Sequence, residues 1–102
     1  MEINIETTGK TAVLQLEGEF VFDSHKVLRA ACAPILANTS TDFIQLELSR
    51  VKYLDSSALG LMLLMKEKAA SAGKAVQIKG ARGAVLQVLE VAKFDHIFEV
   101  MA

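Results

Sequence analysis

Alternation of apolar and polar residues marks the short segments of this chain that we expect to be β-strands. These segments are residues 3–5, 13–17, 43–48 and 75–78. Gly9-Lys10 lies between the first two and predicts a turn, so that they form a hairpin. We expect one more short strand or a helical turn within Phe94–Val100.

Helical spacing of apolar residues marks three further segments. The first begins at Asp23 or Ser24, either of which is a good N-cap, and Pro34 weakens its last turns. The second runs over Ala58–Ala72, and its first half is apolar on every side, so we expect it to be covered on more than one face. The third includes Val85–Ala92.

The order of these segments predicts an α/β fold. Strands separated by helices need right-handed crossovers and form a mostly parallel sheet, and the opening hairpin adds an antiparallel edge. We therefore expect a mixed sheet of four to five strands packed against three to four helices, in a single domain over residues 1–102. Apolar residues make up 52% of the chain and aromatic residues only 6%, which predicts an aliphatic core.

Charge and hydropathy argue against nucleic acid and membranes as partners. The net charge is -1, so we expect no general attraction to nucleic acid or to an anionic membrane. The cation-rich stretch Lys66–Arg82 is typical of a solvated face. The most apolar run, Ala58–Met65, is far shorter than the roughly 20 residues of a membrane span, and residues 1–10 do not resemble a signal peptide. We therefore expect a cytoplasmic protein without membrane insertion.

The cysteine and the histidines predict no metal or cofactor site. Cys32 is the only cysteine, so an internal disulfide is impossible, and its Ala-rich helical surroundings predict a buried, inert thiol. His25 and His96 have no cysteine or carboxylate at metal-binding spacing and are interpreted as structural or surface residues.

The most informative segment is Asp55-Ser56-Ser57, which lies where a strand ends and an apolar helix begins. Ser56 or Asp55 can cap the first turn of that helix, and this role alone accounts for one polar residue. One helix cap needs only one residue, and this segment has three capping candidates in a row. Gly60 is also unusual, because glycine in a helix costs roughly 1 kcal/mol relative to alanine. Its usual reason is the close approach of another backbone, from the fold or from a partner.

The run Leu54–Gly60 strongly resembles the D-S-[ST]-[AG]-L-G signature of STAS domains, the family of bacterial anti-sigma factor antagonists. Gly18-Glu19-Phe20 is similar to the G-E-[LF] that ends the second strand in that family. The order of strands and helices agrees along nearly the whole chain. The resemblance therefore implies the STAS-type mixed sheet.

The resemblance also implies a phosphorylation switch. In the family, the serine that matches Ser56 is phosphorylated by a GHKL-type serine kinase, and a PP2C-type phosphatase removes the phosphate. The unphosphorylated form binds the kinase or anti-sigma factor, with Asp55, Ser57 and Ala58 in the matching contact region. The aspartate that commonly follows G-E-[LF] is Val21 here, so either Asp23 takes over its partner contact or that contact is absent.

Two alternatives differ in class from this switch. The first is a STAS docking subunit that binds constitutively to a transporter or larger assembly, with Ser56 acting only as a cap. The second is a small hydrolase that uses Ser56 with His25 and an aspartate, but the chain has no G-x-S-x-G elbow and no identifiable oxyanion loop. The intact Asp-Ser-Ser favours the switch. We therefore expect a non-enzymatic protein whose Ser56 lies exposed at a helix N-terminus.

Overall fold

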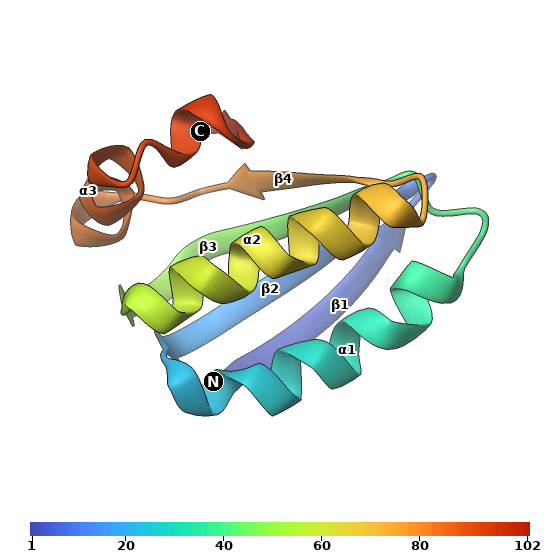
Figure 1. Ribbon diagram of the computed structural model, residues 1–102. Helices are drawn as coiled ribbons and strands as arrows, with labels where there is room; N and C mark the ends of the chain where they lie inside the picture. Colours follow the sequence, from blue (N-terminus) through green and yellow to red (C-terminus); the bar gives the residue numbers. More distant parts are fainter.

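The computed structural model describes all residues from 1 to 102 as a sheet with helices packed on one of its faces (Figure 1). The elements are β1 (Glu2–Thr8), β2 (Thr11–Phe20), the 3-10 turn η1 (Phe22–Ser24), α1 (His25–Ala37), β3 (Phe43–Leu54), α2 (Ser56–Ser71), β4 (Ala75–Lys79), α3 (Gly83–Val91), the 3-10 turn η2 (Phe94–His96) and β5 (Glu99–Met101). The segment expected to be a strand or a helical turn thus contains both.

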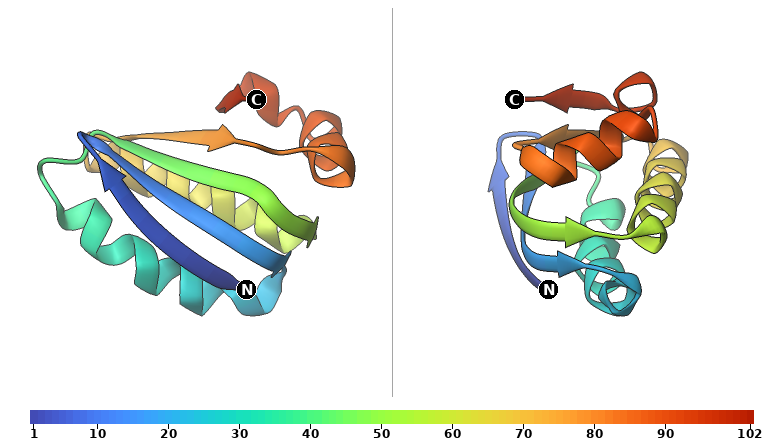
Figure 2. Two further views of the ribbon diagram at one scale, coloured as in Figure 1. Left: turned by 180° about the vertical axis from the view of Figure 1, so that it is seen from behind. Right: turned by 90° about the vertical axis from the view of Figure 1, so that its left-hand side faces the viewer.

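The sheet has the mixed topology that the segment order predicts. Its five strands lie in the order β1-β2-β3-β4-β5. The edge strand β1 is antiparallel to β2, and all other neighbours are parallel. Helices α1 and α2 lie side by side against one face (Figure 2). Buried residues alternate with more exposed ones along most of β2, β3 and β4, so polar residues of these strands lie on the opposite face. The α/β prediction is confirmed.

Most of the core lies between the sheet and the two long helices, and α3 and the η2 segment add Val85, Leu89, Phe94 and Phe98 to it. It contains 23 buried apolar residues. The large side chains that are fully buried are Phe20, Leu14, Leu16, Leu28, Ile44, Leu46, Leu48, Leu61, Met62, Ile78 and Leu89. The aliphatic core expected from composition is present, and Phe20, Phe94 and Phe98 add to it.

Ser24 is the N-cap residue of α1, one of the two candidates that we expected, and the helix begins at His25 after η1. The Ser24 side chain makes no capping hydrogen bond to the helix. The Ser24 hydroxyl instead accepts a hydrogen bond from the Val21 amide (3.1 Å) and donates one to the Glu19 carbonyl (3.2 Å). The buried serine therefore fixes the chain between β2 and α1. Pro34 is accommodated within the helix, which continues to Ala37.

Helix α2 is covered by the sheet on one side and by α1 on another, as expected, but its outer side is open. Leu61, Met62 and Met65 are buried, but Leu63 and Leu64 remain 41% and 38% exposed. The physical reason is the architecture: the sheet lies below α2 and α1 lies beside it, and no further layer covers its outer side (Figure 2).

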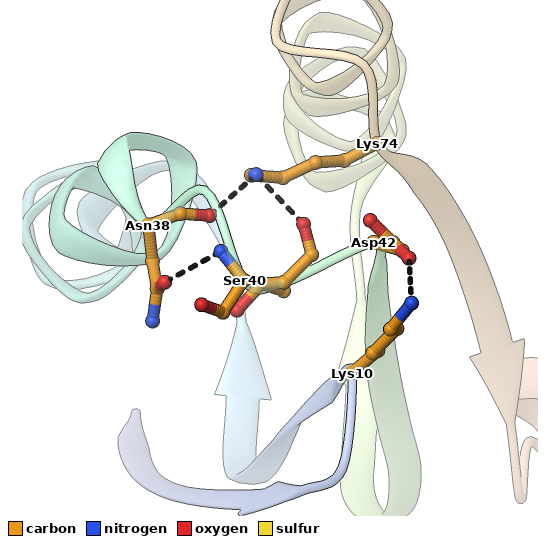
Figure 3. A network of polar contacts seen from close by, with 6 residues as sticks. Lys10, Asn38, Ser40, Asp42 and Lys74 are labelled. Carbon is orange, nitrogen blue, oxygen red and sulfur yellow. Dashed lines mark hydrogen bonds and ion pairs between the residues drawn. The ribbon is translucent and has the colours of Figure 1, made fainter.

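Lys74 is the exception in the cation-rich stretch. Lys66, Lys68, Lys79 and Arg82 are exposed as expected for a solvated face, whereas Lys74 is only 7% exposed. Its Nζ donates hydrogen bonds to the main-chain oxygens of Asn38 and Thr41, each at 2.7 Å (Figure 3). This lysine therefore joins the start of β4 to the loop between α1 and β3.

Candidate functional site

The connection from β2 to α1 and the connection from β3 to α2 lie beside each other at the carboxyl edge of the sheet. Phe20 and Leu54 are neighbours in the parallel register, and the Asp55 amide donates a hydrogen bond to the Phe20 carbonyl (3.2 Å). Turn η1, which contains Asp23, contacts α2 as a result. Two segments far apart in sequence thereby form one surface.

Gly18 shapes this edge of the sheet. It has a φ of 101°, a conformation that side chains disfavour, at a register shift between β2 and β3. Such an irregularity bends the end of a strand. Gly18-Glu19-Phe20 therefore has a structural role: the bend directs the segment after β2, which includes η1, toward the start of α2.

Asp55 is the N-cap of α2. Its Oδ1 accepts hydrogen bonds from the Ala58 amide (3.0 Å) and from the Ser57 hydroxyl (2.7 Å). The Ser57 hydrogen bond, followed by those from neighbouring amides, holds the pKa of the Asp55 carboxyl below its usual value. The sequence left the cap open between Asp55 and Ser56, and the structure assigns it to Asp55, with Ser57 orienting the carboxylate.

Ser56 is left without a structural task. It is the first residue of α2, it is exposed, and its hydroxyl makes no hydrogen bond. Ser57 is half-buried. Ala58 is fully buried, so its side chain packs within the fold and is not available for direct contact with a partner. Of the three polar residues, Ser56 is therefore the one that presents a free nucleophilic oxygen to solvent.

Two exposed aromatic side chains belong to the same edge. Phe22 is 67% exposed and Tyr53 is 54% exposed, although residues of both types are usually more buried. The Phe22 ring rests against His25, with ring centroids 5.4 Å apart. Sequence reasoning missed both residues. For Phe22 the available signal was an apolar residue in the turn between a strand and a helix, and this signal does not reveal exposure.

An apolar groove continues this surface between α2 and α3. Leu59, one helical turn after Ser56, lies on one side of the groove, and Val88 and Val91 lie on the other. The groove has a volume of about 440 Å³, and Val91 is 84% exposed. The edge around Ser56 thus combines the free Ser56 hydroxyl and the carboxylates of Asp55 and Asp23 with exposed apolar side chains.

Gly60 does not serve close packing within the fold. It is exposed, and a Cβ placed on it would meet nothing within 4 Å. Of the two reasons that the sequence left open for this glycine, contact with the rest of the fold is therefore wrong. Approach by a partner stays a prediction.

The two histidines are far apart in the chain, and neither belongs to a cluster of potential metal ligands. His25 begins α1 and His96 ends η2, where its ring is 3.6 Å from the Asp95 carboxylate. No three side chains of His, Cys, Asp or Glu come together in an arrangement that could hold a metal ion. Ser56 makes no hydrogen bond to His25, so the geometry gives no support to a hydrolase. No helix has the length and apolar character needed to cross a membrane.

The comparison with protein families agrees with this fold. Residues 3–101 match the family described as Mlab, STAS domain. The chain therefore belongs to the STAS domain family. A STAS-domain containing protein of Pseudomonas aeruginosa (strain UCBPP-PA14) is 28% identical over 92 residues, which make up 90% of this chain and 89% of that protein.

Solved structures share the same fold. An anti-sigma factor antagonist from Mycobacterium paratuberculosis matches with a TM-score of 0.86 and 18% identity, over 98% of this chain and 84% of that one. The Bacillus cell fate determinant SpoIIAA in its phosphorylated form matches with a TM-score of 0.73 and 18% identity, over 99% and 92% of the two chains. At such identities the likeness is one of fold.

Proposed function

We propose that this protein is a phosphorylation-controlled binding module of the anti-sigma factor antagonist kind. Its unphosphorylated form binds a GHKL-type serine kinase or anti-sigma factor, phosphorylation of Ser56 releases that partner, and a PP2C-type phosphatase restores binding. One observation carries the proposal: Asp55 caps α2 and Ser57 holds the Asp55 carboxylate, whereas the Ser56 hydroxyl is exposed and unbonded. A kinase can therefore modify Ser56 without first breaking a contact that the fold uses.

The electrostatics of the site suit a switch that acts by release. A phosphate on Ser56 adds about -1.5 to -2 charge at neutral pH, and the free amides of a helix N-terminus tolerate an anion there. The Asp55 carboxylate, whose pKa is lowered by the Ser57 hydrogen bond, adds further negative charge beside it. The domain can remain folded while this surface becomes strongly anionic. The phosphorylated form of SpoIIAA, which has the same fold, supports this step.

The apolar surround defines what the unphosphorylated surface can bind. In this proposal the partner covers Phe22 and the groove at Leu59, and excludes water from Ser56 between them. A hydroxyl tolerates such a contact, but a phosphate must be desolvated, which costs several kcal/mol unless cations on the partner compensate. Asp23, exposed on η1, is the acidic residue that we assign to the rim of this interface.

The phosphoacceptor is tested with a GHKL-type serine kinase that binds this protein. Incubation with that kinase and ATP is expected to add one phosphate, located at Ser56 by mass spectrometry, and Ser56→Ala to abolish labelling. Because Ser56 makes no capping bond, this variant should unfold close to the wild-type temperature. Ser57→Ala is the matched control and should still be labelled. If labelling survives in Ser56→Ala and disappears in Ser57→Ala, the phosphoacceptor is Ser57 and our assignment of Ser56 is wrong.

The effect of the phosphate is tested by titrating phosphorylated and unphosphorylated protein against the same partner. We expect the Kd to rise at least a hundredfold, equivalent to about 2.7 kcal/mol. Ser56→Asp should give part of this loss, while Ser40→Asp, an exposed serine in the loop before β3, should give none. Equal affinities of the two forms would instead favour a constitutive docking subunit of a transporter or larger assembly. Tighter binding on phosphorylation would require a phosphate-reading pocket on the partner.

A further inference from the structure

A cavity lies between α1 and α2, away from the Ser56 surface. It has a volume of about 330 Å³ and is lined by residues of both helices, with Ile44 of β3 at its floor. Every lining residue except Arg29 and Lys68 is apolar. Lys68 is twelve residues after Ser56 on the same helix, which corresponds to roughly 18 Å along its axis. The cavity is thus a separate feature from the proposed switch.

The sequence of α1 explains why the space exists. The lining residues Ala30, Cys32 and Ala33 have small side chains, so α1 does not fill the volume beside α2. On the α2 side, Leu61 and Met65 form a buried wall, and Leu64 is 38% exposed at the margin. Packed protein interiors rarely leave voids of this size. An apolar space open to solvent at one side is instead typical of ligand sites.

The charges around the opening are of one sign. Arg29 and Lys68 are both exposed, and neither takes part in an ion pair or a side-chain hydrogen bond. No acidic residue lines the cavity. An apolar interior with two unpaired cations at its margin is complementary to a molecule that has an apolar body and an anionic end.

We infer that this cavity binds a single-chain anionic amphiphile, a medium-chain fatty carboxylate, whose chain lies between α1 and α2 and whose carboxylate meets Arg29 and Lys68. The volume supports one chain, because it is at the lower end of the roughly 300–1,000 Å³ of small-molecule pockets. A lipid with two acyl chains would exceed it. The inference does not depend on the proposed switch, because none of the residues assigned to that switch lines the cavity.

The apolar part of the inference is tested with decanoate, titrated below its aggregation concentration and followed by amide NMR shifts. We expect saturable binding of one molecule, with shifts in α1, α2 and Ile44. Ala33→Phe, which places a ring in the cavity from an exposed position, should weaken binding at least tenfold. Ala37→Phe is the matched control, since Ala37 is exposed on the same helix but does not line the cavity. Non-saturable shifts, or equal binding by both variants, would overturn the inference.

The charged part is tested by comparing decanoate with decanol. The double change Arg29→Gln with Lys68→Gln should weaken decanoate binding at least tenfold and leave decanol binding unchanged. Lys66→Gln, an exposed cation of α2 outside the cavity, should change neither. If wild-type protein binds decanol as tightly as decanoate, the cations do not recognise the ligand and the assignment to a carboxylate is wrong. These surface changes remove no buried group, so they remain informative even if Ala33→Phe does not fold.

Cys32 offers a second readout in the wild-type chain. It is the only cysteine, it lines the cavity, and burial raises its pKa to about 11. Alkylation of this thiol should be slow, and a bound chain should slow it further. We expect saturating decanoate to lower the alkylation rate at least fivefold. An unchanged rate would show that the chain does not enter between the helices, and would overturn the placement.

Discussion

The buried lysine opposite the switch surface allows a sharp test of how the fold is held together. Lys74 connects β4 to the loop between α1 and β3 through two hydrogen bonds to main-chain oxygens, of Asn38 and Thr41. Lys74→Met keeps the apolar stem of the side chain and removes only the ammonium group. The change therefore isolates the two hydrogen bonds from the packing around them.

The expected loss follows from the burial of each bond. A hydrogen bond with a charged donor contributes about 1.5–3 kcal/mol net. The bond to Thr41 is buried and should contribute in full, whereas the bond to Asn38 is partly buried, so water can replace part of it. Together they give a destabilisation of about 2–4 kcal/mol. That is a large share of the roughly 5–15 kcal/mol that stabilises a small domain.

Urea denaturation followed by circular dichroism measures this loss directly. The midpoint should fall at an unchanged m-value, and the melting temperature should fall by about 10 °C or more. Lys79→Met is the matched control, because Lys79 is exposed on β4, and it should change stability by less than about 0.5 kcal/mol. If the two variants lose the same small amount, water or a rearranged loop replaces the Lys74 ammonium and our reasoning about this lysine is refuted.

Two further predictions concern the first turns of α2. Asp55→Ala should lower the melting temperature at neutral pH, while Asp55→Asn, which keeps an acceptor for the Ala58 amide, should lower it less. Because folding lowers the pKa of Asp55, the ionised carboxylate stabilises the folded state at pH values above the unfolded pKa of about 3.9. This stabilisation is lost as the pH falls through the folded pKa. Urea titrations at decreasing pH should therefore show the stabilities of wild type and Asp55→Asn converging. Gly60→Ala should stabilise the protein by up to about 1 kcal/mol, since a methyl group there meets nothing, and should weaken partner binding; a gain in stability without loss of binding would remove the functional reason for this glycine.

The pattern of the sequence determined the local elements and the position of the candidate site. Alternation in residues 43–48 and helical spacing after Ala58 depend on neighbours a few residues away, so they can be recognised without knowledge of the fold. The same holds for the polar run that contains Ser56, because the junction of a strand with a helix is itself a local feature.

The tertiary structure alone decided the role of each of these residues and whether its side chain is buried or exposed. The division of labour between Asp55 and Ser56 depends on hydrogen-bond geometry, and the two residues are equivalent as capping types. The burial of Lys74 depends on a loop more than thirty positions away in the chain. The exposure of Leu63, the display of Phe22 and the cavity beside Cys32 all depend on which surfaces meet. Periodicity states which residues share a face of an element, and only the packing of distant elements states whether that face is covered.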